Sequence, residues 1–178
     1  MSEHLDKINS LLHKRFKKNA PQLIKASELP PIEFISTGML GYDWVNGGGG
    51  PRGKVEQVYG RRSSGKTTTL LRRIAEAQRL GHKCAYIDVE HELDKSWAKL
   101  LGVDLDDLLI HSPYYEPAEI TLGVVEELLA SGEFGLIGVD SITALGTEAM
   151  LNKDMGDKHY GGIAGLMEMF YKRVIGTG

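Results

Sequence analysis

Residues 60–67 constrain the fold of this chain more than any other segment. They read Gly-Arg-Arg-Ser-Ser-Gly-Lys-Thr and match the pattern G-x-x-x-x-G-K-[ST] at every fixed position. The β-branched and aromatic residues of 55–59 predict a strand before the segment. The apolar spacing of residues 68–80 predicts a helix after it, with Leu71, Ile74, Ala75 and Gln78 on the buried face. A strand, a glycine-rich turn and a helix in this order predict a binding site for a nucleoside triphosphate.

Each residue type in this loop has a chemical reason. Gly60 and Gly65 let the backbone turn tightly, so that successive N–H groups point at phosphate oxygens. Lys66 can reach the β- and γ-phosphates, and the Thr67 hydroxyl can bind Mg²⁺. We therefore expect the contacts to the nucleoside triphosphate to come from consecutive residues of this loop and of the helix that follows: Gly60, Arg61, Arg62, Ser63, Ser64, Gly65, Lys66, Thr67 and Thr68.

Composition narrows the class of protein. The chain has 178 residues, 42% of them hydrophobic and 25% charged, as in an ordinary globular domain. A formal net charge of -3 favours no global attraction to a polyanion, so any nucleic-acid surface has to be local. Cys84 is the single cysteine, which excludes an internal disulfide and fits a cytoplasmic protein. We expect no contact with a membrane, because no apolar run approaches spanning length.

The N-terminal segment predicts a separate unit. Residues 3–18 alternate apolar and basic side chains at helical spacing, and prolines at Pro21, Pro30 and Pro31 then mark a linker. A basic amphipathic helix can contact nucleic acid or an anionic membrane, or it can dock through its apolar face and leave its charges in water. We favour docking, either on the helix's own domain or on a neighbouring copy in oligomerisation. The expected division is 1–31, a helix and linker, and 32–178, a core that carries the phosphate loop.

The remaining chain alternates strand and helix patterns. Such alternation predicts an α/β core with a mostly parallel sheet flanked by helices. The expected strands are 84–88, 108–110 and 136–140, and the expected helices are 96–101, 117–131 and 166–174. In the helix over 117–131 we expect an inward face of Ile120, Val124, Leu128 and Leu129.

Carboxylates follow two of the predicted strands. Asp140 ends the apolar strand 136–140, where an aspartate completes the Mg²⁺ site of phosphate-loop enzymes, usually through water. Glu90 follows the strand over 84–88, where a carboxylate can deprotonate an attacking water. Asp88, Glu92 and Asp94 lie nearby, and spacing alone does not choose among the four.

Several segments together resemble the bacterial RecA recombinase family. They are Ile-Ser-Thr-Gly at 35–38, the loop at 63–68, Ile-Ala-Glu-Ala-Gln at 74–78, Ile-Asp-Val-Glu-His-Glu-Leu-Asp at 87–94, Leu-Gly-Val-Asp at 101–104, Val-Asp-Ser at 139–141 and Met-Gly-Asp-Lys-His-Tyr-Gly at 155–161. The resemblance runs in order from residue 35 to residue 161. It implies a RecA-like P-loop NTPase core preceded by an N-terminal amphipathic helix.

The resemblance also implies roles for individual residues. Glu90 corresponds to the water-activating glutamate, and Asp140 to the metal-site aspartate that works with Thr67. Asp94 corresponds to a residue that approaches the adenine amine, and Trp97 stands where the family commonly stacks a tyrosine on the base.

Residues 152–161 correspond to the family's first DNA-binding loop. Without the resemblance this segment is a polar connector. With it, the expected DNA contacts are Lys153, Gly156, Asp157, Lys158, His159 and Gly161.

Three features depart from the family pattern. Arg61 and Arg62 stand where the family typically carries Pro-Glu, and Gly165 stands where it usually has a DNA-contacting arginine. The family also continues past the position of residue 178 with further strands, a sensing glutamine, a second DNA loop and a C-terminal domain. We therefore expect this core to be incomplete at its C-terminal end.

The implied function is that of an ATP-dependent DNA recombinase. Such a protein is a DNA-dependent ATPase that uses ATP and Mg²⁺, self-associates into a filament on single-stranded DNA and pairs it with a homologous duplex in recombination and repair. Two alternatives remain open. One is a nucleotide-binding regulatory or interaction protein of recombinase filaments, and the other is a RecA-fold ATPase such as a hexameric helicase or a clock-type ring.

Overall fold

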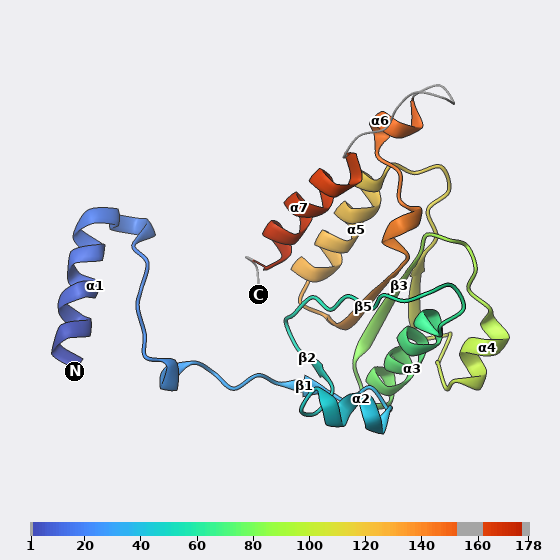
Figure 1. The fold of residues 1–178 in the computed structure, drawn as a ribbon, viewed down its shortest axis with the longest axis horizontal. Helices are drawn as coiled ribbons and strands as arrows, with labels where there is room; N and C mark the ends of the chain where they lie inside the picture. Colours follow the sequence, from blue (N-terminus) through green and yellow to red (C-terminus); the bar gives the residue numbers. More distant parts are fainter. Residues whose placement is uncertain (1, 153–161, 176–178) are drawn as a thin grey trace. The chain divides into compact units, whose positions relative to one another are not determined.

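The computed structural model describes residues 2–152 and 162–175. The chain divides into two compact units, residues 1–33 and residues 34–178 (Figure 1). The second unit contains the strands of the described residues and the predicted phosphate loop.

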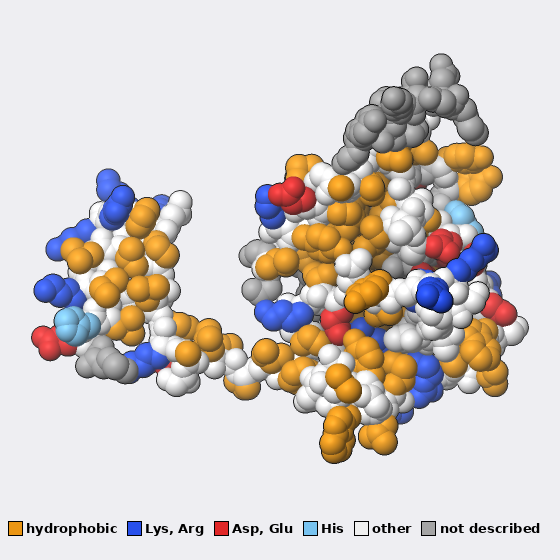
Figure 2. Space-filling model, in the orientation of Figure 1, with side chains coloured by type: hydrophobic (Ala, Val, Ile, Leu, Met, Phe, Trp, Pro, Cys, Tyr) orange, Lys and Arg blue, Asp and Glu red, His pale blue; other side chains and the backbone are white. Residues whose placement is uncertain are grey.

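Helix α1 (Ser2–Phe16) and two short 3-10 helices (Lys17–Asn19 and Ala26–Glu28) make up the regular structure of the N-terminal unit. The side-chain amide of Asn9 fixes the returning chain, because it both donates to and accepts from the main chain of Leu23, at 2.9 Å each. Ile8, Leu11 and Phe16 remain exposed, and Figure 2 shows hydrophobic side chains on one side of this unit and basic ones on another. The expected amphipathic helix is confirmed.

Three parallel strands form the central sheet. They are β3 (Lys83–Asp88), β4 (Leu108–His111) and β5 (Phe134–Asp140), in the order β4-β3-β5. The register places Asp88 opposite Asp140, so the acidic ends of β3 and β5 meet at one edge of the sheet. Ligands bind at this edge in open α/β sheets. The α/β class predicted from the sequence is confirmed.

Helices cover both faces of the sheet (Figure 1). Helices α3 (Lys66–Arg79) and α4 (Lys95–Leu100) contribute to one core, and α5 (Ala118–Ala130) and α7 (Gly162–Ile175) contribute to the other. Successive β3 residues alternate between the cores, with Tyr86 in the first and Ile87 in the second, as the pleat of a strand requires. Cys84 belongs to the first core. Burial raises the pKa of its thiol to about 12, so at neutral pH it is an uncharged core residue.

A small two-stranded antiparallel sheet precedes the phosphate loop. Strands β1 (Phe34–Ile35) and β2 (Gly50–Pro51) pair antiparallel, and α2 (Leu40–Val45) lies between them in the chain. Gly49 has a φ of 132°, and a Cβ there would collide with the carbonyl group of Ile35. The glycine run therefore lets two backbones approach closely.

The strand predicted for residues 55–59 is wrong. Residues 54–60 have no regular secondary structure, and Val55 and Val58 are 45% and 43% exposed. The segment is held instead by Glu56, which pairs with Arg73 on α3 and accepts a 2.8 Å hydrogen bond from Tyr42. Strand propensity has no effect without a neighbour to complete a ladder, and within the described residues β5 pairs with β3 alone.

The expected inward face of α5 is also wrong in part. The buried residues of this helix are Ala118, Thr121, Leu122 and Val125, while Ile120 is 54% and Leu129 is 40% exposed. Helix α5 is apolar around much of its circumference, so hydrophobic spacing did not distinguish the face that packs from the face that does not. Two short elements, the 3-10 helix Ile142–Ala144 and α6 (Glu148–Leu151), were not predicted.

Over residues 2–152 and 162–175, the structure contains no helix that is both long enough and apolar enough to span a bilayer.

Candidate nucleotide-binding site

The predicted phosphate loop leads directly into α3, whose first residue is Lys66. Gly65 has a φ of 89° at the N-terminal end of this helix, a conformation that glycine adopts without strain. A Cβ at Gly60 would lie 2.6 Å from the hydroxyl oxygen of Ser64. Gly65 is therefore favoured by its backbone conformation and Gly60 by the close approach of Ser64, and the turn aims the N-terminus of a 14-residue helix at the site.

The Lys66 ammonium lies against its own loop. Its Nζ donates to the carbonyl oxygens of Gly60 at 3.4 Å and Arg61 at 3.3 Å. Both distances are beyond the usual length for an N–H···O bond, so both bonds are weak. The ammonium can exchange these carbonyls for a stronger anionic acceptor at little cost.

The two predicted metal-site residues are in direct contact. Thr67 Oγ1 donates to Asp140 Oδ2 at 2.6 Å, although the residues lie 73 positions apart in the sequence. The same carboxylate oxygen accepts a 3.1 Å hydrogen bond from the Tyr86 hydroxyl. Burial first, and then the nearby Asp140 carboxylate, raise the pKa of the Tyr86 phenol far above its ordinary value, so Tyr86 acts as a donor.

This pair is chemically suited to Mg²⁺. A hydroxyl and a carboxylate are hard oxygen ligands, and Mg²⁺ usually takes only one or two protein oxygens beside water and phosphate. In the part of the chain that the structure describes, no group of three or more His, Cys, Asp or Glu side chains has a metal-binding arrangement. The donor set thus fits an ion shared with a triphosphate, and it does not fit a site made by protein ligands alone.

The four carboxylates after β3 have different environments. Asp88 is 6% exposed and accepts the main-chain N–H groups of Glu92 and Leu93, both at 3.2 Å. Asp94 caps α4 by accepting from Ser96 N at 2.8 Å and Trp97 N at 3.1 Å. These two therefore stabilise the turn and the helix that follow β3.

Glu90 is bound differently. Its carboxylate is exposed and accepts a hydrogen bond from Ser141 Oγ, directly after β5. Its main-chain N–H also reaches the carbonyl of Asp140, at 3.4 Å. Glu90 thus presents a carboxylate beside the Thr67–Asp140 pair and does not cap a turn.

Trp97 lies close to the start of α3. Its indole Nε1 donates to Thr68 Oγ1 at 3.3 Å, and the side chain is 41% exposed. An accessible aromatic ring fixed beside the phosphate loop is suited to stacking on a base.

A polar pocket of about 230 Å³ joins these groups. Its lining residues come from α3, β3, the turn after β3, α4 and β5: Thr67, Thr68, Tyr86, Asp88, Glu90, Glu92, Trp97 and Asp140. The pocket therefore brings together the predicted metal pair, Glu90 and Trp97. Asp94 does not line it. Arg61, Arg62, Ser63 and Ser64 lie exposed on the loop.

The predicted DNA contacts lie outside the described residues. Lys153, Gly156, Asp157, Lys158, His159 and Gly161 all fall between the end of the segment at 152 and the start of α7.

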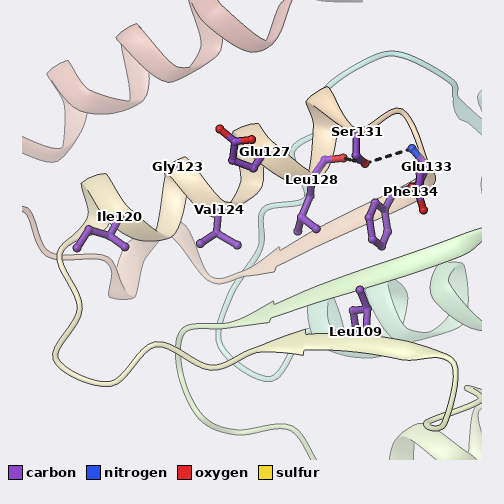
Figure 3. A pocket seen from close by; sticks show the side chains of 9 residues that line it. All are labelled: Leu109, Ile120, Gly123, Val124, Glu127, Leu128, Ser131, Glu133 and Phe134. Carbon is purple, nitrogen blue, oxygen red and sulfur yellow. Dashed lines mark hydrogen bonds between the residues drawn. The ribbon is translucent and has the colours of Figure 1, made fainter.

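A second concave surface lies between α5 and the edge strand β4. Unlike the polar pocket, it is lined mostly by apolar side chains. This groove has a volume of about 740 Å³, and Figure 3 shows Ile120, Val124 and Leu128 pointing from α5 toward the sheet, where Leu109 faces them. Its remaining lining residues are Gly123, Glu127, Ser131, Glu133 and Phe134.

Sequence reasoning missed two site residues, Tyr86 and Ser141. Tyr86 looked like an ordinary apolar strand residue, and Ser141 was noted only within a family motif. The sheet register identifies Tyr86. This residue lies two positions before Asp88 on β3, and because β3 pairs with β5, its hydroxyl reaches Asp140 at the end of β5. Ser141 becomes recognisable only once the ends of β3 and β5 are side by side.

Comparison with known proteins agrees with this geometry. The chain matches the family described as the RecA N-terminal domain over residues 3–177. It is 43% identical over 174 residues to Protein RecA of a Nitratiruptor species, covering 97% of this chain and 50% of that protein. It is 46% identical over 169 residues to Protein RecA of Wolinella succinogenes, covering 93% of this chain and 47% of that protein.

A third relative, Protein RecA of Acinetobacter baylyi, is 40% identical over 177 residues, or 99% of this chain and 50% of that protein. The chain thus spans about half the length of the curated relatives it matches. Since the family match covers residues 3–177, nearly the whole chain, this chain belongs to the RecA family.

Proposed function

We propose that this chain carries the nucleotide-binding part of an ATP-dependent DNA recombinase. The observation that supports the proposal most directly is the convergence of Thr67, Asp140 and Glu90 on one pocket at the start of α3. A phosphate loop, a metal pair and an exposed carboxylate are the parts that phosphoryl transfer to water requires.

The loop and Lys66 bind the triphosphate. Main-chain N–H groups and the N-terminus of α3 supply fixed partial positive charge, and the Lys66 ammonium moves from its weak carbonyl acceptors to the β- and γ-phosphates. Trp97 stacks on the base, with Asp94 beside the adenine amine.

Thr67 and Asp140 hold Mg²⁺, which when bound neutralises charge on the phosphates. The Thr67 hydroxyl donates its proton to Asp140 Oδ2, so its lone pairs are available to the ion. Tyr86 donates to the same carboxylate oxygen and fixes its orientation.

Glu90 acts on water. It accepts a proton from the attacking water as that water's oxygen forms a bond to the γ-phosphorus. The bond from the γ-phosphorus to the β–γ bridging oxygen breaks, and ADP and phosphate leave. Glu90 then returns its proton to solvent, for which its exposed position is suited.

The same proposal assigns single-stranded DNA and a homologous duplex as partners. It rests on the family resemblance of residues 152–161, with Lys153, Lys158 and His159 as phosphate contacts and Gly156, Asp157 and Gly161 shaping the loop. DNA binding and ATP hydrolysis are then coupled activities of one filament.

Self-association uses the N-terminal unit. Helix α1 exposes Ile8, Leu11 and Phe16 and carries basic residues in its last turn. The groove between β4 and α5 exposes an apolar stripe and has the acidic Glu127 among its lining residues, while its other glutamate, Glu133, pairs with Lys83. The exposed apolar side chains of α1 can pack against the apolar lining of the groove, and its basic residues can approach Glu127. We therefore assign the groove of one copy to α1 of a neighbouring copy.

The decisive experiment measures ATP hydrolysis with and without single-stranded DNA. Glu90→Gln should leave binding of a fluorescent ATP analogue intact and lower the hydrolysis rate about a hundredfold, the usual scale for loss of a general base. Glu92→Gln, a change of the same chemistry in the same pocket, should cause a far smaller loss. If both variants fell equally, or neither did, Glu90 would not be the base.

A further inference from the structure

Glu90 is held by a hydroxyl from another strand end. Ser141 Oγ donates to Glu90 Oε1, and Thr143 Oγ1 lies 2.6 Å from the same Ser141 oxygen. Glu90 follows β3 and Ser141 follows β5, 51 residues later in the chain. The contact therefore exists only because the sheet places these two ends side by side.

Main-chain bonds fix the two ends relative to each other. The carbonyl oxygen of Asp140 accepts from Val89 N at 2.9 Å and from Glu90 N at 3.4 Å. On the other side, Ala144 N donates to the Ser141 carbonyl at 3.2 Å and closes a short turn that carries Thr143. The Ser141 hydroxyl is thus aimed at Glu90 by backbone geometry, unlike a chance contact between two mobile surface side chains.

The chemistry of the three groups sets the direction of the hydrogen bonds. An ionised carboxylate only accepts, so the single Ser141 proton goes to Glu90. Ser141 can then bind Thr143 only as an acceptor, which makes Thr143 the donor of the 2.6 Å bond. The order runs from Thr143 to Ser141 to Glu90, and each bond polarises the next.

We propose that Ser141, supported by Thr143, is the positioning residue for Glu90. By occupying Oε1 it fixes the carboxylate plane and leaves Oε2 as the oxygen that takes the proton from water. This inference rests on the proposed role of Glu90 in hydrolysis. Thr143 has no contact with the carboxylate and acts through Ser141.

A purely structural role for Ser141 has a different signature. If the hydroxyl served only to stabilise the end of β5, its removal would lower stability and affect nucleotide binding and turnover together. A positioning role predicts a lower kcat at an unchanged KM, because substrate binding does not depend on Glu90 orientation.

The test compares Ser141→Ala with Ser141→Thr, which restores a hydroxyl, in the full chain. Ser141→Ala should lower kcat for ATP hydrolysis about tenfold, the scale expected for loss of one hydrogen bond to a charged group, with KM and analogue binding unchanged. Ser141→Thr should recover most of the rate. Ser112→Ala is the matched control, since Ser112 Oγ contacts His91 Nδ1 at 2.7 Å, next to Glu90, without touching its carboxylate.

Two further measurements separate this inference from the function on which it rests. In a Glu90→Gln background Ser141→Ala should cause no additional loss, because no base remains to be positioned. In the nucleotide-free chain, Ser141→Ala should shift the carboxyl carbon resonance of Glu90 and leave that of Glu92 in place.

The outcomes are distinguishable. If Glu90→Gln abolishes hydrolysis but Ser141→Ala leaves both kcat and the Glu90 resonance unchanged, the positioning role is wrong while the proposed function stands. An equal loss from Ser141→Ala in the presence and absence of Glu90 also overturns it. If Glu90→Gln has no effect on hydrolysis, the proposed function fails first, and the role proposed for Ser141 fails with it.

Discussion

Two concave surfaces of this protein have different kinds of side chain. In the polar pocket at the ends of β3 and β5, polar side chains hydrogen-bond to one another, whereas the groove between β4 and α5 exposes apolar side chains to water. At the pocket, Thr67 and Tyr86 donate to Asp140, and Ser141 donates from outside the lining to Glu90, all within the same copy. In the groove, Ile120 is 54% and Leu109 is 58% exposed. These side chains form no hydrogen bonds, so nothing offsets the unfavourable free energy of their exposure to water.

This difference indicates two kinds of ligand. A prearranged set of polar groups recognises a small charged molecule, because its geometry is fixed before binding. The apolar lining of the groove is stabilised when another apolar surface covers it and removes it from water, whatever the detailed hydrogen bonding. The polar pocket is thus suited to a small charged ligand, and the groove is suited to a second polypeptide.

The largest effect is expected in the pocket. Lys66→Ala removes the ammonium that faces the loop, so we expect binding of a fluorescent ATP analogue with Mg²⁺ to weaken at least about a hundredfold, through loss of charge-assisted contacts to phosphate. Lys54→Ala changes an exposed lysine outside the loop and serves as the control. Equal binding by the Lys66 variant and the parent would remove the basis of the nucleotide assignment.

The groove is tested by complementation between copies. Leu11→Asp on α1 and Val124→Asp in the groove should each reduce self-association at least about tenfold, because each places a charge in an apolar contact. A mixture of the two should form dimers and nothing larger, since one intact helix and one intact groove remain per pair. Sedimentation measures this directly.

Leu100→Asp provides the matched control for the groove. Leu100 is an apolar residue that is 75% exposed on α4, outside the groove, so the same chemical change there should leave association intact. If the mixture stayed monomeric, α1 would not bind the groove of a neighbour, and the groove would not be the self-association surface.

The smallest effect is expected at Tyr86. Tyr86→Phe keeps the buried ring and removes one of the two hydroxyl donors to Asp140, so Mg²⁺-dependent nucleotide binding should weaken about two- to fivefold. Tyr171→Phe, on α7, controls for loss of a phenol elsewhere. The measurement is a titration of Mg²⁺ at fixed analogue concentration. If analogue binding by Tyr86→Phe equalled that of the parent, Thr67 alone would orient the Asp140 carboxylate.

Local sequence was sufficient for the phosphate loop and for the residues that end the strands. The spacing of Gly60, Gly65, Lys66 and Thr67 identified the turn, because tight turns and helix starts depend on neighbouring residues. Asp140 was found for a similar reason, as a carboxylate at the end of an apolar run. Spacing did not separate Glu90 from Asp88 and Asp94. Their hydrogen bonds do, since the latter two cap the turn and α4.

The two wrong expectations share a cause. Residues 55–59 have strand propensity, and α5 has apolar residues on more than one side, but a ladder or a buried face requires a partner that sequence patterns do not reveal. The partners are decided by topology. Within the described residues β5 has β3 as its only neighbour in the sheet, and α5 packs through Leu122 and Val125.

The sequence by itself thus determined the chemical groups on which the proposed function rests: a phosphate-loop motif, a threonine and an aspartate proposed for Mg²⁺, and a nearby glutamate. Only the tertiary structure decided which groups touch. The parallel register that sets Asp88 opposite Asp140 brings Tyr86 to the metal pair and Ser141 to Glu90, across 54 and 51 residues of chain. Hydrogen bonds act over about 3 Å, and positions so far apart in sequence reach that distance only when the sheet forms.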